Sequence, residues 1–152
     1  MKRYSIRWHE ERCTGCQACM VACMDEKDIR PSEGEQPGCR VRATGQPQSP
    51  FWELCICRHC RKPACVQVCV SQALHRDAQT GLVLCEPERC IGCGRCASAC
   101  PAGAITLDHH RIARKCDGCA ERIRAGLLPA CVRACPGGAL TAECTDTDTG
   151  IR

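Results

Sequence analysis

Sixteen of the twenty cysteines in this 152-residue chain fall into four short motifs. In chain order, the motifs are Cys13-x2-Cys16-x2-Cys19-x3-Cys23, Cys57-x2-Cys60-x4-Cys65-x3-Cys69, Cys90-x2-Cys93-x2-Cys96-x3-Cys100 and Cys116-x2-Cys119-x11-Cys131-x3-Cys135. Closely spaced thiolates of this kind hold one face of an iron–sulfur cubane, and the fourth thiolate is directed toward a neighbouring cluster. Sixteen such ligands predict four [4Fe–4S] clusters, and a protein that carries them transfers electrons.

Zinc sites and disulfide scaffolds are the two other common uses of a cysteine-rich sequence. A structural zinc site takes two Cys-x2-Cys pairs separated by a spacer, and it has no use for a third cysteine placed close by. Disulfide scaffolds are usually shorter than this chain. The spacing therefore favours iron–sulfur clusters over both alternatives.

The composition agrees with a fold that depends on its clusters. Leu, Ile, Val and Phe account for only 24 of the 152 residues, which is below the fraction expected of a globular core. Clusters that cross-link four positions each can replace part of such a core. We therefore expect folding to be coupled to cluster insertion.

Charge and hydropathy limit the possible partners. The formal net charge is +4, but four clusters with their thiolates would add about −8, and no aromatic-studded nucleic-acid motif accompanies the basic residues. No apolar run reaches the length of a membrane span, and residues 1–9 contain no apolar secretory core. We expect no nucleic-acid partner and a cytoplasmic location, or export together with a partner that carries the signal.

An internal repeat organises the sequence. Arg12–Cys16 reads R-C-T-G-C and returns as R-C-I-G-C in Arg89–Cys93. Pro63–Cys69 likewise returns as Pro129–Cys135, and an Ala-Leu pair follows each copy. Motifs one and two thus match motifs three and four, which indicates an old duplication.

The segment between motifs two and three predicts a hairpin, with strands at Ala73–Arg76 and Leu82–Leu84. Gly103–Leu107 predicts another short strand after motif three. We therefore expect an α+β fold with little regular secondary structure, made of two pseudo-symmetric, bacterial ferredoxin-like dicluster units. Residues 55–107 would form one unit, and residues 1–54 with 108–152 would form the other.

If motifs two and three share one unit, motifs one and four must pair across the sequence in the other. Each cluster then takes three cysteines from one motif and its fourth from the partner motif. The expected ligands are Cys13, Cys16, Cys19 and Cys135 for cluster 1; Cys57, Cys60, Cys65 and Cys100 for cluster 2; Cys90, Cys93, Cys96 and Cys69 for cluster 3; and Cys116, Cys119, Cys131 and Cys23 for cluster 4.

Short helices and one long loop complete the expected structure. Helices are expected at Met20–Lys27 and at Ala120–Ala125, where Gly126 ends the second one. Residues 30–50 are rich in Pro, Gly and Gln, which predicts an irregular surface loop and makes this stretch our candidate for a partner contact. The tail after Glu143 is expected to fray.

The four motifs in this order resemble, over nearly the whole sequence, a known family of electron-transfer subunits. These are the four-cluster, ferredoxin-like beta subunits of the dimethyl sulfoxide reductase family and related molybdenum or tungsten oxidoreductases. The resemblance is clearest in Arg12–Cys19, His59–Cys65 and Lys115–Cys119. It implies the same cross-pairing of motifs, and a row of clusters that leads from a buried pterin site toward a second redox partner.

The resemblance is specific for four clusters and much less specific for the partner. It implies a non-catalytic subunit that works with a larger Mo/W-pterin catalytic subunit and with a second redox protein or flavin subunit. Similar subunits serve tungsten aldehyde oxidoreductases, nickel–iron hydrogenases and carbon monoxide dehydrogenases. The alternative is therefore a ferredoxin-like subunit or maturation accessory of a hydrogenase or carbon monoxide dehydrogenase.

Four cysteines fall outside the motifs. Cys55 and Cys85 have apolar neighbours and are expected to be small buried side chains, whereas Cys39 and Cys144 are expected to be incidental thiols in a loop and in the tail. His59 lies between two expected ligands, where it either tunes cluster 2 by hydrogen bonding or faces solvent. We find no nucleophile–base pair and no phosphate-binding glycine loop, so no catalytic residues are expected.

Overall fold

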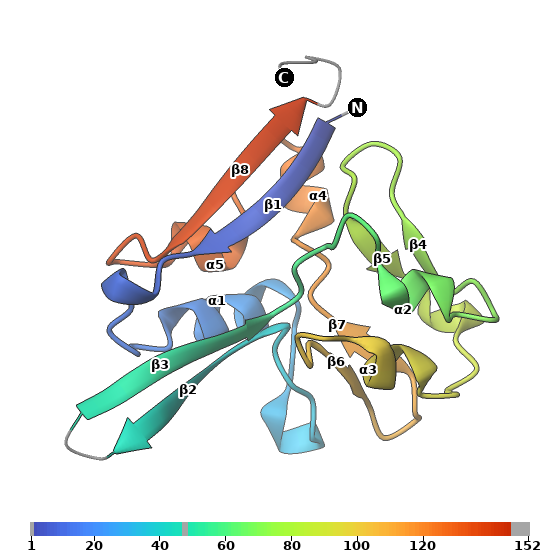
Figure 1. Ribbon diagram of the computed structural model, residues 1–152, viewed down its shortest axis with the longest axis horizontal. Helices are drawn as coiled ribbons and strands as arrows, with labels where there is room; N and C mark the ends of the chain where they lie inside the picture. Colours follow the sequence, from blue (N-terminus) through green and yellow to red (C-terminus); the bar gives the residue numbers. More distant parts are fainter. Residues whose placement is uncertain (1, 47–48, 147–152) are drawn as a thin grey trace.

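The computed structural model describes residues 2–46 and 49–146, which form an α+β fold of short helices and two-stranded antiparallel sheets (Figure 1). The strands are β1 (Lys2–Trp8), β2 (Cys39–Gln46), β3 (Ser49–Ile56), β4 (Leu74–Arg76), β5 (Val83–Cys85), β6 (Ile105–Leu107), β7 (Ala113–Lys115) and β8 (Leu140–Asp146). The α-helices are α1 (Ala18–Glu26), α2 (Ala64–Gln67), α3 (Arg95–Ala99), α4 (Ala120–Arg124) and α5 (Ala130–Arg133). Single 3-10 turns are η1 (Glu10–Arg12), η2 (Pro31–Glu33) and η3 (Pro87–Arg89).

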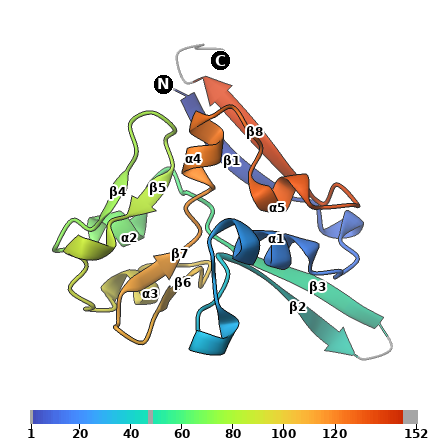
Figure 2. The ribbon, with the colours of Figure 1, turned by 180° about the vertical axis from the view of Figure 1, so that it is seen from behind.

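The elements gather into two groups that lie on opposite sides of the molecule. Figure 1 shows β1, β8, α1, α5 and the β2–β3 hairpin on the left, and α2, α3 and the sheets β4–β5 and β6–β7 on the right. The view from behind in Figure 2 shows the same separation. Helix α1 packs on α5, and α2 packs on α3. Motif one, which includes the first part of α1, therefore lies beside motif four, and motif two lies beside motif three.

The sheet β1–β8 joins the two ends of the described sequence. Its register runs from Lys2 opposite Asp146 to Trp8 opposite Leu140. The sequence predicted neither strand. The tail was expected to fray after Glu143, but β8 continues to Asp146, so this expectation is wrong for residues 144–146. Each strand finds its hydrogen-bonding partner more than 130 residues away, and local sequence does not reveal such a partner. The remainder of that tail, residues 147–152, lies outside the described residues.

Residues 30–50 form the predicted irregular loop only as far as residue 38, with the single turn η2 in it. Cys39–Gln46 instead form β2, which pairs with β3 in the register Cys39–Ile56 through Gln46–Ser49. The side chains of Cys39 and Val41 are only 1% and 7% exposed. Burial of these alternating side chains against the motif-one half of the core stabilises a strand whose other residues have little strand propensity.

The other expected elements are present. The hairpin β4–β5 and strand β6 lie where the sequence predicted them, and α1 and α4 begin and end within two residues of the expected bounds. Strand β6 pairs with β7, which the sequence did not predict. Two hairpins therefore cross the expected unit boundaries, because β2–β3 extends past residue 55 and β6–β7 extends past residue 107.

Cysteines form much of the small core. The largest buried cluster joins the left-hand elements and contains more cysteines than any other residue type. A second cluster centres on Leu74, Val83 and Ile105 in the right-hand group, and a third packs Leu82 against α4. Several buried core positions would thus also bind clusters, namely Cys19, Cys57, Cys96, Cys116, Cys119 and Cys131.

Candidate iron–sulfur centres

A left-handed residue shapes the first loop of every motif. The residues two positions after the first cysteine are Gly15, His59, Gly92 and Gly118, and their φ angles are 69°, 44°, 68° and 70°. Glycine adopts a positive φ without steric strain, and the resulting tight turn brings the flanking thiols to the same side of the loop. Motif two makes the same turn with a histidine.

The thiols expected to bind cluster 1 line one cavity. Cys13, Cys16 and Cys19 from the motif-one loop and α1 face Cys135, which follows α5. Cys19 is buried, whereas Cys16 is exposed. The backbone N–H of Ala139 donates a hydrogen bond to Cys135 Sγ at 3.2 Å.

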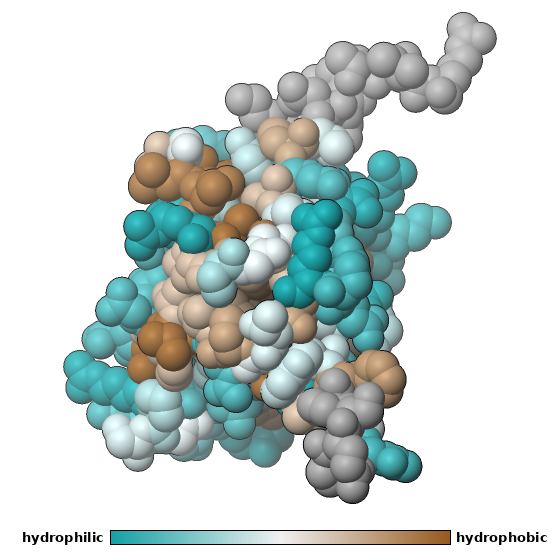
Figure 3. Space-filling view, turned by 90° about the vertical axis from the view of Figure 1, so that its left-hand side faces the viewer, coloured by the Kyte–Doolittle hydropathy of each residue, from teal (hydrophilic) through white to brown (hydrophobic). Residues whose placement is uncertain are grey.

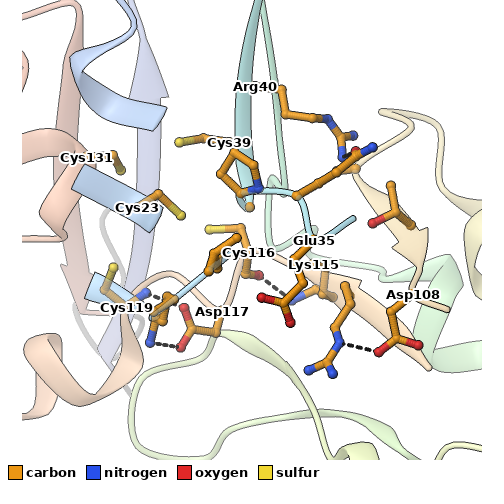
Figure 4. A pocket seen from close by; sticks show the side chains of 18 of the residues that line it. Cys23, Glu35, Cys39, Arg40, Asp108, Lys115, Cys116, Asp117, Cys119 and Cys131 are labelled. Carbon is orange, nitrogen blue, oxygen red and sulfur yellow. Dashed lines mark hydrogen bonds and ion pairs between the residues drawn. The ribbon is translucent and has the colours of Figure 1, made fainter. Parts of the chain in front are cut away.

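A second cavity is surrounded by five cysteines (Figure 4). Cys23 comes from α1, Cys131 from α5, and Cys116 and Cys119 from the loop between β7 and α4, while Cys39 comes from the start of β2. Figure 4 shows the five sulfur atoms gathered on one side of the cavity. The first four are the residues expected for cluster 4.

Burial controls the first two thiols of motif four. It raises the pKa of Cys116 well above its usual value and raises the pKa of Cys119 to about 11. Free thiols in these positions therefore stay protonated at neutral pH. Bound iron reverses this preference, because a coordinated thiol loses its proton.

A third cavity lies in the right-hand group of elements. It is lined by Cys69, Cys90, Cys93 and Cys96, which are the residues expected for cluster 3, together with Cys85 from β5. The backbone N–H groups of Leu74 and Ala113 donate to Cys69 Sγ and Cys90 Sγ, each at 3.5 Å.

The residues expected for cluster 2 meet at the boundary between the two groups of elements. Burial raises the pKa of the Cys65 thiol, and the nearby thiols of Cys57 and Cys100 raise it further, which places these three residues together. Cys60 follows Cys57 on the same loop, and its carbonyl oxygen accepts a hydrogen bond from Arg76. The placement of the Cys60 thiol beside the other three stays a prediction of the motif spacing.

The fourth cysteine of three motifs accepts a backbone hydrogen bond in a repeated pattern. Cys69, Cys100 and Cys135 each accept from an amide four or five residues later, and the three donors are Leu74, Ala104 and Ala139. Each donor lies at or just before the strand that follows its motif. Hydrogen bonds to a cluster's sulfur ligands stabilise their negative charge and tune its reduction potential.

These four sets of thiols fit cubanes better than single ions. Across residues 2–46 and 49–146, no three or more His, Cys, Asp or Glu side chains come close enough to hold one metal ion. A cubane binds its thiolates at four separate corners, so a wider ring of sulfur atoms with backbone donors suits it.

Comparison with known proteins agrees with this donor set. Residues 51–144 match the family model of the 4Fe-4S dicluster domain, and residues 10–24 match that of the 4Fe-4S binding domain. The B subunit of the anaerobic dimethyl sulfoxide reductase of Haemophilus influenzae is 38% identical over 147 residues, covering 87% of this chain and 69% of that protein. This protein belongs to the family of dimethyl sulfoxide reductase B subunits.

A second relative of this protein is the thiosulfate reductase electron transfer subunit PhsB of Salmonella typhi. It is 38% identical over 136 residues, which cover 86% of this chain and 70% of that protein. The cysteine motifs and the family matches together mean that the protein carries four [4Fe–4S] clusters. In the part of the sequence that the structure describes, no helix is long and apolar enough to cross a membrane.

One solved structure shares the fold of this protein at low sequence identity. It is the active site complex BamBC of benzoyl coenzyme A reductase with zinc, with a TM-score of 0.50 and 19% identity. The match covers 97% of this chain and 82% of the matched one.

The structure corrects the expectation for Cys39 and decides between the two alternatives for solvent exposure of His59. Cys39 is not an incidental loop thiol, because it is almost fully buried in the five-cysteine cavity. His59 does not face solvent: it is 3% exposed, and its Nδ1 accepts a hydrogen bond from the Val83 N–H at 2.9 Å. Burial lowers the pKa of His59 to about 3, so its imidazole is neutral. Cys55 and Cys85 are only half-buried, whereas Cys144 is exposed.

Proposed function

We propose that this B-subunit family member relays electrons between a larger catalytic subunit with a molybdenum- or tungsten-pterin cofactor and a second redox protein or flavin subunit. The names of its relatives support this role, since they are subunits of reductases and one is called an electron transfer subunit. The clusters supply one-electron chemistry, and the polypeptide holds them, shields them and sets their surroundings. The subunit itself would catalyse no reaction.

The proposed ligand sets cross-pair motif one with four and motif two with three. For clusters 1, 3 and 4, the support is that each expected set of four thiols lines one cavity. For cluster 2, the support is the proximity of Cys57, Cys65 and Cys100. The packing of α1 on α5 and of α2 on α3 agrees with the same pairing.

Hairpins that cross the expected boundaries suggest slightly different units. We place residues 57–115 in one ferredoxin-like unit and the rest of the sequence in the other, and we propose that the two are pseudo-symmetric. The repeated N–H···S contacts to Cys69, Cys100 and Cys135 support this relationship, because they recur in both proposed units.

The relay would have one end in each unit. Among the sixteen motif cysteines only Cys16 and Cys93 are exposed, and they belong to the expected clusters 1 and 3 on opposite sides of the molecule. An exposed ligand marks the place where a cluster comes nearest to an external partner. This difference in exposure is the observation that carries the proposal of a two-ended relay.

Exposed apolar side chains accompany both ends. Val70 and Ile91 directly follow two cluster 3 cysteines, and Val21 and Phe51 lie on α1 and β3, the elements beside cluster 1. Figure 3 shows the cluster 1 side of the molecule, where apolar surface occupies the centre of the face and hydrophilic side chains surround much of it. Surfaces of this kind suit protein contacts.

The two proposed units would exchange electrons between clusters 2 and 4. The electrostatic influence of Cys57 reaches the thiol of Cys116, which places the two motifs next to each other. Lys115 lies at the same junction, where its ammonium group donates to the carbonyl oxygens of Val83 and Cys116. A positive charge here would offset the negative charge of two adjacent clusters.

Anaerobic purification after mild lysis tests the proposed role. We expect a pterin-containing large subunit to co-purify, and about sixteen iron and sixteen sulfide atoms per polypeptide. Co-purification with a hydrogenase or carbon monoxide dehydrogenase, or with no large subunit at all, would contradict the proposed partner. About eight iron atoms per polypeptide would contradict the four-cluster ligand sets.

The cross-pairing has its own test. Cys135→Ser should alter the same electron paramagnetic resonance signal as Cys16→Ser, because both residues would bind cluster 1. Cys119→Ser should alter a different signal. If Cys135→Ser instead shares its signal with Cys119→Ser, the pairing is wrong.

A further inference from the structure

Cys39 is a fifth thiol at the proposed cluster 4 site, and its position is fixed by backbone packing. Gly38 approaches the motif-four loop so closely that a Cβ atom on it would lie 2.8 Å from Cys116 Cα. Directly after Gly38, β2 begins, and the Cys39 side chain enters the cavity. Only glycine at position 38 permits this approach.

The surroundings of Cys39 are sulfur atoms of the expected ligands. Its thiol lies beside those of Cys23, Cys131 and Cys19 and lowers the pKa of each, while its single S–H donates to the Cys19 carbonyl oxygen at 3.3 Å. The backbone N–H groups of Gly38 and Cys39 also hydrogen-bond the Cys23 thiol. The start of β2 thus presents two backbone donors and a neighbouring thiol to a single ligand.

Cys39 differs from the other extra thiol that lies in a cluster cavity. Cys85 lines the cluster 3 cavity, but its Sγ is directed to the Ala113 carbonyl oxygen at 3.6 Å, and no hydrogen bond joins it to a ligand thiol. Cys39 alone among the described non-motif cysteines therefore combines burial with hydrogen bonding to expected ligands.

We propose that Cys39 is a positioning residue for cluster 4: when the cluster is bound, its single S–H turns from the Cys19 carbonyl oxygen to the ligand sulfur atom of Cys23 or Cys131 and raises the reduction potential of that cluster. The proposal rests on the ligand sets proposed above. Two of the three neighbouring thiols belong to cluster 4, which makes this cluster the one most affected. A hydrogen bond to a negatively charged thiolate stabilises the reduced cluster more than the oxidised one.

The test compares Cys39→Ala and Cys39→Ser with Cys144→Ala in the anaerobically purified holo-protein with any bound partner. Cys144 is an exposed cysteine on β8, far in sequence from the β2 strand that carries Cys39, and serves as the control. The measurements are iron per polypeptide and a redox titration of each cluster signal by electron paramagnetic resonance. We expect Cys39→Ala to keep its full iron content and to shift the reduction equilibrium of one cluster about tenfold toward the oxidised form, which is about 59 mV for a one-electron couple.

The serine variant separates hydrogen bonding from packing. Cys39→Ser keeps a donor, so its shift should be smaller than that of Cys39→Ala, and Cys144→Ala should shift nothing. Unchanged potentials in Cys39→Ala, or equal shifts in both Cys39 variants, would overturn the donor role alone. Loss of about four iron atoms in both variants would show that Cys39 is a ligand, which would overturn this inference and the proposed cluster 4 set together.

Discussion

Gly15→Ala should destabilise cluster 1 through a clash that the structure locates. Gly15 has a φ of 69°, and a Cβ atom on it would lie 2.2–2.4 Å from three atoms of the Trp52 ring. The left-handed backbone costs an alanine about 1–2 kcal/mol. Displacing a packed ring costs about 1–3 kcal/mol more, so we expect a total of about 2–5 kcal/mol.

The matched control is Gly34→Ala. Gly34 also has a left-handed backbone, with a φ of 79°, but no atom lies within 4 Å of the Cβ position that alanine would add. The difference between the two variants therefore isolates the clash with Trp52. We expect that difference to be about 1–3 kcal/mol, and each 1.4 kcal/mol corresponds to a factor of about ten.

The assay follows the loss of cluster absorbance from the holo-protein in the presence of an iron chelator. Gly15→Ala should lose cluster 1 faster than Gly34→Ala, and adding Trp52→Ala should remove most of the difference, because the two changes share one contact. Equal rates for the two glycine variants would refute the reasoning. A double variant that loses its clusters no more slowly than Gly15→Ala would also refute it.

Two further predictions concern charged residues. Burial raises the pKa of Asp77, but hydrogen bonds from Thr80 and Arg124 outweigh burial, and the net pKa is lowered. The ionised carboxylate therefore stabilises the fold at every pH above about 5, and this stabilisation disappears only below that range. Asp77→Asn should speed cluster loss by an amount that stays constant from about pH 8 to about pH 5. A deficit that shrinks toward pH 5 would contradict this sign. Lys115→Met should leave the iron content unchanged and lower the reduction potential of cluster 4. A unit charge about 8 Å from a cluster, at an effective dielectric of about 20, stabilises the added electron by about 2 kcal/mol. An unchanged redox titration would show that the charge of Lys115 does not reach the cluster.

The sequence predicted the chemistry of the site well because cluster binding is encoded in local spacing. Each motif carries its own turn, in which a left-handed residue such as Gly92 follows the first cysteine, so the loop needs little help from the rest of the fold. Family membership and the four-cluster complement are confirmed by the comparisons. The ligand sets and the unit boundaries stay predictions until the variants above are measured.

Long-range pairing is what the sequence did not reveal. Strands β1 and β8 pair over a separation of more than 130 residues, and composition gave no signal for either. The same limit explains the error at residues 30–50, where Cys39 and Val41 alternate on a strand otherwise made of polar and small residues. Two inward-facing residues are too few for a periodic pattern, although a cysteine alternating with valine was a hint that the strand had a buried face.

The β2–β3 hairpin links these errors to function. On one strand, Trp52 covers the Gly15 turn of the cluster 1 loop, and on the other, Cys39 enters the cluster 4 cavity. A deletion of residues 32–48, which composition alone would suggest as a test of partner docking, would remove Cys39 and half of the hairpin. Loss of a partner in that variant would then follow from damaged cluster sites. We propose instead that the hairpin shields the expected sites of clusters 1 and 4, and point variants on its two strands can separate that role from docking.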